Sequence, residues 1–261
     1  MITNKHGEKL VGLLHESESK EIVVLCHGFK SSKGDIVLVN LAAALEKEGI
    51  SVFRFDFAGY GESEGSLRFA DFDREADDIR AVVQHFSGEN RAVGASLVLL
   101  YAAKYHDIRV IVNVSGRCDL KRDLTEDFVE KIKKDGFIDI MNKKGNLFNF
   151  RNAASCLIAF IYLGKVDVRA TEQDLMNILT FDMREACRKI SKECRVLTVH
   201  GSADKINPVV DALAFAKVIC NHQLHIIEGA DHRYTSHQTE LVAAVVKFLK
   251  SALQQDKHSR L

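Results

Sequence analysis

The sequence predicts an α/β fold in which a mostly parallel sheet is covered by helices on both faces. Short apolar runs rich in Val, Ile, Leu and Phe alternate along the chain with stretches whose apolar residues recur at helical spacing. The 261 residues are 46% hydrophobic, which suits one large domain with a substantial core. We therefore expect residues 1–261 to form a single domain.

Six apolar runs rich in Val, Ile, Leu or Phe are predicted to be strands, and most of them end in a loop that carries Gly, Ser, Asp or His. They span residues 9–15, 21–27, 51–57, 109–115, 195–201 and 224–228. The predicted helices span residues 35–48, 69–86, 97–105, 208–219 and 237–255. Ligands of such sheets bind beyond the carboxyl ends of the strands, so the loops that follow the strands are searched first for a site.

The stretch from 120 to 193 departs from this alternation. Its pattern is helical, its first half is charged, and it contains an apolar run at 153–164. We expect a helical cap, or lid, inserted before the last strands. The apolar run is interpreted either as a helix packed on the core or as a lid surface that accepts an acyl or aromatic group. It is shorter than the roughly 20 residues that span a bilayer.

Charge and composition argue against several classes of partner. Lys plus Arg (36) equals Asp plus Glu (36), so no net charge attracts nucleic acid or an anionic membrane. The six cysteines are scattered and are expected to be reduced, and the N-terminus lacks a signal pattern, so a cytoplasmic location is expected. No metal-ligand spacing or Gly-rich phosphate loop is found, which predicts no metal and no cofactor.

An acid and a histidine follow two late strands. Asp204 comes after the run 195–201, and His232 comes after the run 224–228. This order and placement are what a Ser-His-Asp relay requires, with Asp204 orienting His232 as general base. The early strand ends at a His-Gly turn, where the backbone N–H of Phe29 is expected to serve an oxyanion hole.

Four stretches carry a resemblance to a known family. They are VLCHGF at 24–29, FRFDFAGYGES at 53–63, VHGSAD at 199–204 and EGADH at 228–232. In content and order they resemble the α/β-hydrolase superfamily, and within it plant and bacterial serine hydrolases of the feruloyl/cinnamoyl-esterase-like and monoacylglycerol-lipase-like kind, with a serine aminopeptidase S33-like domain. The resemblance implies an α/β-hydrolase fold, a Ser-His-Asp triad and a small-molecule ester substrate.

The nucleophile is assigned to Ser96, in AVGASLV at 92–98. It precedes the predicted helix 97–105, and Leu97 is expected to supply a second oxyanion N–H. The glycine expected two residues after the serine is replaced by Val98. A literal G-x-S-x-G centred on Ser63 lies several residues beyond its strand and leads into no apolar helix, so Ser63 is not preferred. Ser115, after the strand 109–115, is interpreted as structural.

The segment before Ser96 departs from the resemblance. Only residues 91–93 are left for a central strand before Gly94, about 10 Å at about 3.3 Å per residue, so that strand is expected to be too short, as if roughly nine residues were missing. Three hypotheses follow: an active carboxylic-ester hydrolase, a non-catalytic binding protein with the same fold, or an unproductive isoform whose sheet has a hole. Substrate choice and oligomeric state stay open.

Overall fold

The computed structural model describes residues 1–19, 21–86, 90–94, 97–122, 124–140 and 168–258. Its main sheet has seven strands in the order β11-β10-β7-β6-β4-β5-β3. All neighbours pair in parallel except β3, which is antiparallel to β5. The strands are β3 (Gly12–His15), β4 (Glu21–Cys26), β5 (Ser51–Phe55), β6 (Asn90–Gly94), β7 (Val110–Val114), β10 (Arg195–Gly201) and β11 (His222–Ile227). The predicted mostly parallel α/β fold is confirmed.

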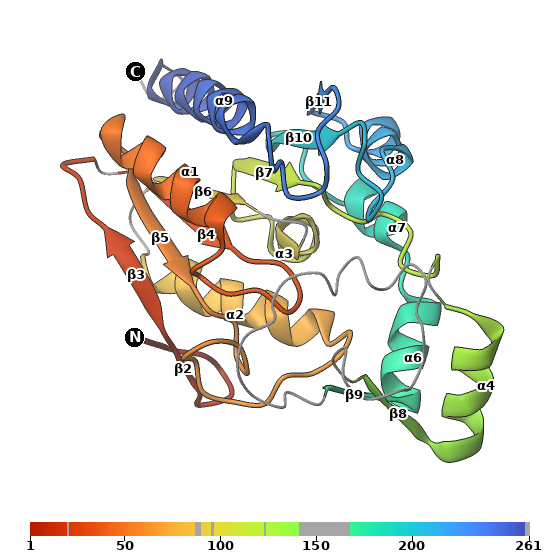
Figure 1. Ribbon diagram of the computed structural model, residues 1–261. Coiled ribbons are helices and arrows are strands. Elements are labelled where there is room, and N and C mark those ends of the chain that lie inside the picture. Colours follow the sequence, from red (N-terminus) through yellow and green to blue (C-terminus); the bar gives the residue numbers. More distant parts are fainter. Residues whose placement is uncertain (20, 87–89, 95–96, 123, 141–167, 259–261) are drawn as a thin grey trace.

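Helices cover both faces of this sheet (Figure 1). One face packs against α1 (Ile36–Lys47) and α9 (Gln238–His258). The other packs against α2 (Phe72–His85), α3 (Leu97–Tyr105), α7 (Met183–Arg188) and α8 (Val210–Val218). All six residues of β4 are buried, as expected for a strand covered on both sides. Its apolar sequence therefore does not alternate.

The N-terminal run predicted as one strand is broken at Val11. The N–H of Val11 donates to Oγ of Ser63 (2.8 Å), and its carbonyl oxygen accepts from the N–H of Asp56 (2.9 Å). The run therefore divides into β2 (Lys9–Leu10), which pairs with β1 (Ile2–Thr3), and β3. A contact with a distant loop thus overrides the local strand pattern.

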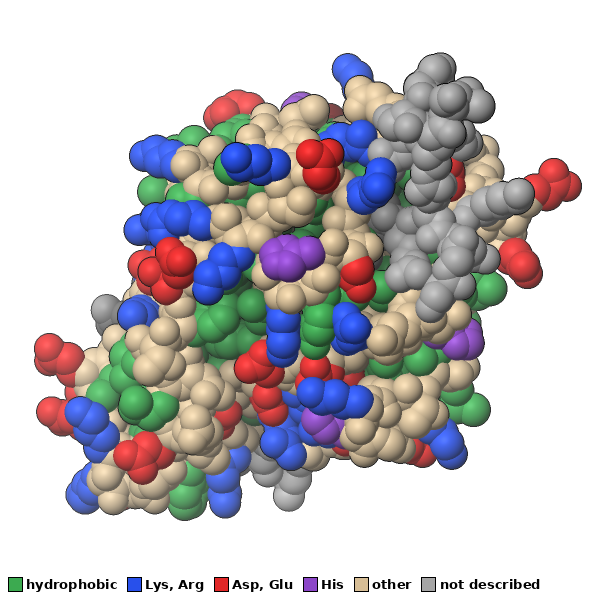
Figure 2. Space-filling model, turned by 180° about the vertical axis from the view of Figure 1, so that it is seen from behind, with side chains coloured by type: hydrophobic (Ala, Val, Ile, Leu, Met, Phe, Trp, Pro, Cys, Tyr) green, Lys and Arg blue, Asp and Glu red, His purple; other side chains and the backbone are tan. Residues whose placement is uncertain are grey.

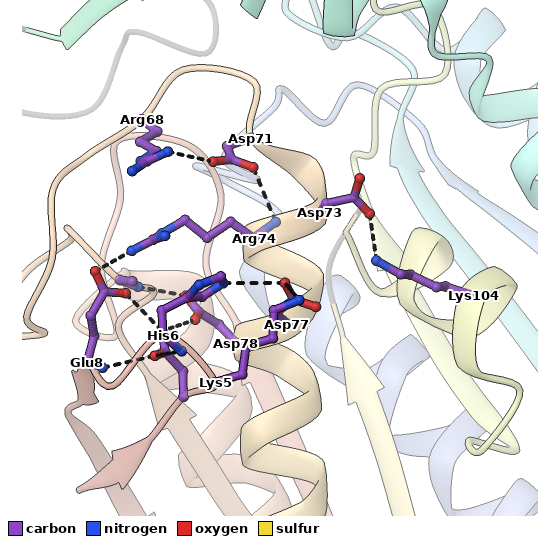
Figure 3. A network of polar contacts seen from close by, with 12 residues as sticks. Lys5, His6, Glu8, Arg68, Asp71, Asp73, Arg74, Asp77, Asp78 and Lys104 are labelled. Atoms are coloured by element: carbon purple, nitrogen blue, oxygen red, sulfur yellow. Dashed lines mark hydrogen bonds and ion pairs between the residues drawn. The ribbon is translucent and has the colours of Figure 1, made fainter.

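The N-terminal β1–β2 pair is fixed to α2 by polar contacts (Figure 3). Asn4 Nδ2 donates to Oδ1 of the buried Asp78 (2.7 Å), and the Lys5 ammonium lies 2.6 Å from Oδ2 of Asp77. The other carboxylate oxygen of Asp78 accepts from the N–H of Ala58 (2.8 Å). One buried carboxylate therefore joins the chain terminus, α2 and the loop after β5.

The central strand is longer than expected. β6 contains five residues and pairs with β4 over its whole length, from Asn90 opposite Glu21 to Gly94 opposite Leu25. It also pairs with β7 over three residues, so the described sheet is continuous between β4 and β7. The expectation of a three-residue strand was wrong because a polar residue, Asn90, is accommodated at the amino end of the strand. Five residues still span only about 16 Å.

The segment between β7 and β10 forms a separate group of elements at one end of the molecule (Figure 1). It contains α4 (Glu126–Asp135), β8 (Phe137–Ile140), β9 (Val168–Thr171) and α6 (Glu172–Thr180), ahead of α7. β8 and β9 form an antiparallel ladder, although the sequence pattern predicted only helices here. These elements share a small apolar cluster centred on Phe128 and Ile132. The apolar run 153–164 lies outside the described residues.

The molecular surface mixes charges of both signs. Figure 2 shows acidic and basic side chains interspersed over the face turned away from the view of Figure 1. This agrees with the equal numbers of acidic and basic residues in the chain. Among the described residues, we find no helix with the length and apolar character needed to cross a membrane.

Candidate active site

Asp204 and His232 are brought together at the carboxyl ends of β10 and β11. Nδ1 of His232 lies 2.8 Å from Oδ2 of Asp204. The Asp204 side chain is 0% exposed, whereas the His232 side chain is 26% exposed. A carboxylate that accepts from Nδ1 holds the imidazole proton on that nitrogen, so Nε2 keeps its lone pair for a reacting proton. The arrangement has the geometry of a general base and its orienting acid.

The second carboxylate oxygen of Asp204 is held by the backbone. Oδ1 accepts from the N–H groups of Ile206 (2.8 Å) and Asn207 (2.9 Å). Nε2 of the buried His200 lies 3.4 Å from Oδ2, and burial lowers the pKa of His200, so this second histidine is neutral. Two N–H donors on Oδ1 leave Oδ2 facing His232.

Asn207 connects the Asp204 loop to its neighbours. Its Nδ2 donates to the carbonyl oxygen of Ser115 (2.7 Å), and its carbonyl oxygen lies 2.7 Å from Nε2 of His200. Its Oδ1 accepts from Nε of Arg117 (2.7 Å). Asn207 is 4% exposed, so these are interior hydrogen bonds. The sequence analysis missed Asn207, because an Asn in a loop carries no spacing signal.

The loops that carry Asp204 and His232 lie directly against each other. The N–H of Ala203 donates to the carbonyl oxygen of Ala230 (3.0 Å). A Cβ atom at Gly201 would lie 2.2 Å from that same oxygen. Only glycine permits this approach, so Gly201 sets the separation on which the contact between the acid and the histidine depends.

The loop after β4 is joined to the His232 loop. Arg233 Nη2 lies 3.4 Å from Oδ2 of Asp35, the residue that caps α1. Oγ of Ser31 donates to the same carboxylate oxygen (3.0 Å), and Asn40 Nδ2 donates to Gln238 (3.1 Å). These contacts bring residues 28–35 to the same edge of the sheet as His232.

The direction of the Phe29 N–H is set by its neighbours. Nδ1 of the buried His27 lies 2.8 Å from the carbonyl oxygen of Gly28, and Nε2 of His27 accepts from the N–H of Phe57 (3.2 Å). Burial lowers the pKa of His27, which therefore donates through Nδ1 as a neutral ring. In a trans peptide the N–H points away from the preceding carbonyl, so this anchor sets the direction of the Phe29 N–H. Among the described residues, no hydrogen bond uses that N–H.

A buried acid supports the same loop from the neighbouring strand. Asp56 follows β5 and is 0% exposed. Its carboxylate accepts from the backbone N–H of Lys33 (2.6 Å) and of Glu62 (3.0 Å), and it pairs with the Lys33 ammonium. Asp56 thereby connects the loops after β4 and β5. Asp56 lies within the stretch 53–63 that carries the family resemblance, and this position could have drawn attention to it. No role was predicted for Asp56 from the sequence.

The two serines not preferred as nucleophile have structural partners. Oγ of Ser63 donates to the carbonyl oxygen of Asp56 (2.6 Å) and accepts from the N–H of Val11 (2.8 Å). Ser115 is buried, and its Oγ lies 2.8 Å from the hydroxyl of Tyr234. Both hydroxyls are engaged inside the fold, so the literal G-x-S-x-G at 61–65 forms a turn rather than a strand-to-helix elbow.

Ser96 lies outside the described residues. In the chain it stands between β6, which ends at Gly94, and α3, which begins at Leu97. Val98, in the position where glycine was expected, is 0% exposed and belongs to the core on the α2 and α3 side of the sheet. Phe29 follows β4, the strand that pairs with β6.

No metal site is found among the described residues. No group of three or more His, Cys, Asp or Glu side chains is arranged to hold an ion there. His222 Nε2 lies 2.8 Å from Oγ1 of Thr198.

Comparisons with known proteins agree with the fold. The family model described as serine aminopeptidase, S33, matches residues 17–146. A 31.7 kDa protein of Escherichia coli, from the traX-finO intergenic region, is 22% identical, with 80% of this chain and 82% of the relative covered.

Two solved structures illustrate the structural likeness. Est1E from Butyrivibrio proteoclasticus with bound ferulic acid has a TM-score of 0.71 and 21% identity, covering 97% of this chain and 99% of that one. An esterase from Exiguobacterium antarcticum has a TM-score of 0.67 and 17% identity, covering 95% and 98%. The strand order, the structural likeness and the family match lead to one conclusion: this chain has the α/β-hydrolase fold, and its residues 17–146 match the serine aminopeptidase S33 family.

Proposed function

We propose that this protein is a serine hydrolase that acts on carboxylic esters of small acyl or aromatic-acyl groups. The observation that carries the proposal is the 2.8 Å contact between Nδ1 of His232 and the buried carboxylate of Asp204. The N–H of Phe29, which donates no hydrogen bond among the described residues, supports it, and so does the place of Ser96 in the chain between β6 and α3. The family match supports a hydrolase.

The reaction would proceed through a covalent acyl-enzyme. Ser96 Oγ attacks the acyl carbon while Nε2 of His232 takes the hydroxyl proton, and the imidazolium is stabilised by Asp204. The N–H groups of Phe29 and Leu97 stabilise the oxyanion of the tetrahedral intermediate. His232 then returns the proton to the leaving alkoxide. Water attacks the acyl group by the same route and regenerates Ser96.

A fluorophosphonate probe tests this assignment, because it reacts with an activated serine. Purified protein is labelled, digested, and the modified peptide is located by mass spectrometry. Label is expected on Ser96 in the wild type and in Ser63→Ala, and it is expected to disappear in His232→Ala and Asp204→Asn. Circular dichroism confirms that each variant is folded.

The competing hypothesis is a protein of this fold that binds a ligand without turnover. Its motivation is the replacement of the expected glycine by Val98 and the short β6. Folded wild-type protein that takes up no label on any serine, and hydrolyses no aryl ester, would establish this second hypothesis and refute the first.

A further inference from the structure

Two lysines in the loop after β4 have opposite surroundings. Lys33 is buried, and its ammonium pairs with the carboxylates of Asp56 and Glu62. Burial by itself would lower the pKa of Lys33, but the hydrogen bonds and charges of the two carboxylates outweigh it and raise that pKa. Lys30 lies three residues earlier and is also partly buried.

The Lys30 ammonium has no counter-ion within the part of the chain that the structure describes. No carboxylate there lies within ion-pair distance of its Nζ, and burial lowers its pKa with no acidic group to oppose the shift. Its Nζ lies over the ring of Phe29, 5.9 Å from the ring centroid. A partly desolvated cation without a partner favours the binding of an anion.

The backbone holds Lys30 in a defined place. The N–H of Ser31 donates to the carbonyl oxygen of Gly28 (3.2 Å), which closes a turn with Phe29 and Lys30 at its centre. Lys30 has a φ of 54°, in the left-handed region that glycine or asparagine adopts more readily. The shape of the turn therefore gives no reason for a lysine at this position.

The ring of Phe29, which lies beneath the Lys30 ammonium, packs against other apolar groups. The Phe29 ring packs edge-on against Phe69 at 5.6 Å between centroids, and against Tyr60 at 6.5 Å. Both Phe29 and Phe69 contact the apolar cluster around Phe128. An amphiphilic molecule that laid its apolar part on these rings would bring a charged end within reach of Lys30.

We propose that Lys30 forms an anion subsite at the edge of the active site, which binds a carboxylate carried by the ester substrate. The apolar part of that substrate lies against Phe29 and Phe69. This inference rests on the proposed function, which places the ester group of the substrate at the active site. It narrows the substrate class to half-esters of dicarboxylic acids or esters of hydroxy-acids. Lysine suits this role because its ammonium is a point charge on a flexible stem.

Matched ester pairs test the subsite. For the acyl side, 4-nitrophenyl hemiglutarate is compared with 4-nitrophenyl pentanoate. For the alcohol side, 4-(butyryloxy)benzoate is compared with its methyl ester. Lys30→Gln is expected to lower kcat/KM about tenfold for the anionic ester of one pair, mainly by raising KM. A tenfold loss is the size expected when one charge-assisted contact is removed.

Control variants separate this effect from a general loss. Lys30→Arg keeps the charge and is expected to retain most of the preference for the anionic ester. Lys217→Gln removes an exposed lysine on α8 and is expected to change neither member of a pair. A Lys30→Gln protein that loses the same factor on neutral and anionic esters, or loses nothing on either, overturns the subsite.

A binding measurement keeps the subsite separate from catalysis. N-phenylglutaramic acid and N-phenylpentanamide are amide analogues that an esterase does not readily cleave. The acid is expected to raise the Tm of the wild type but not that of Lys30→Gln. The neutral amide is expected to change the Tm of both proteins by the same amount. Equal shifts in both proteins, or no shift in the wild type, refute the subsite. A Lys30-dependent shift in a protein that hydrolyses no ester contradicts only the proposed function.

Discussion

Nε of Arg117 donates a 2.7 Å hydrogen bond to Oδ1 of Asn207, and this bond joins the start of the segment after β7 to the loop that carries Asp204. The same asparagine donates through its backbone to the carboxylate of Asp204 and through Nδ2 to Ser115. The position of the acid therefore depends on the segment that leads toward α4.

Asn207→Ala is expected to lower the free energy of unfolding by about 1–3 kcal/mol, because the interior partners on Arg117 and Ser115 lose their hydrogen bonds. Hydrolysis is expected to lose about tenfold in kcat with little change in KM, since the variant displaces Asp204 but no substrate contact. Urea unfolding and steady-state kinetics measure the two effects. Asn221→Ala, at an exposed site, is the control. Unchanged stability and kcat in Asn207→Ala would show that Asp204 is positioned without it.

Ser63→Ala is expected to cost about 1–2 kcal/mol of stability and to leave fluorophosphonate labelling intact. The reason is that Ser63 bonds to Asp56 and Val11 and so holds the break between β2 and β3. Thermal unfolding and probe labelling test this together. Ser66→Ala, a change at a nearby exposed serine, should alter neither quantity. Loss of the label in a folded Ser63→Ala protein would transfer the nucleophile to Ser63.

Arg122→Ala is expected to destabilise the protein by about 2–4 kcal/mol, because it leaves the Asp211 carboxylate buried without its cation. Both guanidinium contacts of Arg122 to Asp211 are 2.7 Å, and Asp211 is 2% exposed. Arg188→Ala breaks an ion pair whose two side chains are 54% and 55% exposed, and it should cost less than about 1 kcal/mol. Urea unfolding compares the two. Equal effects would mean that the Asp211 pair behaves as a surface pair.

Stability is expected to fall on acidification partly through His222, whose pKa burial lowers to about 4. The unfolded chain takes up this proton below about pH 6.5, whereas the folded protein resists it until about pH 4, so unfolding is favoured as the pH falls through that window. The contribution is about 1 kcal/mol at pH 5, allowing for the partial exposure of the ring.

His222→Gln should flatten the dependence of stability on pH between 4 and 6.5 and can keep a hydrogen bond to Thr198. His225→Gln, at an exposed position of the same strand, is the matched control and should leave that slope unchanged. Urea unfolding at a series of pH values measures both slopes. The same slope in His222→Gln as in the wild type would assign the acid sensitivity to other buried groups.

Local pattern was sufficient for much of the fold and for half of the site. The bounds of β10 and α3 match the predicted 195–201 and 97–105, because apolar periodicity records which faces are buried. The pairing of Asp204 with His232 was predicted from two positions after neighbouring strands, and the structure places them 2.8 Å apart. Parallel strands bring the loops at their carboxyl ends together, so order along the chain was enough.

The sequence by itself thus determined the α/β class and the placement of Asp204 and His232 after neighbouring strands at one edge of the sheet. Tertiary structure alone decided that β8 pairs with β9 across the segment between them, that Ser63 is a structural hydroxyl, and that Asn207 joins Asp204 to Arg117. It also decided that Lys30 has no counter-ion among the described residues while Lys33 has two. The physical reason is that periodicity reports burial, whereas a hydrogen bond between residues 90 positions apart depends on side-chain directions that no spacing in the chain encodes.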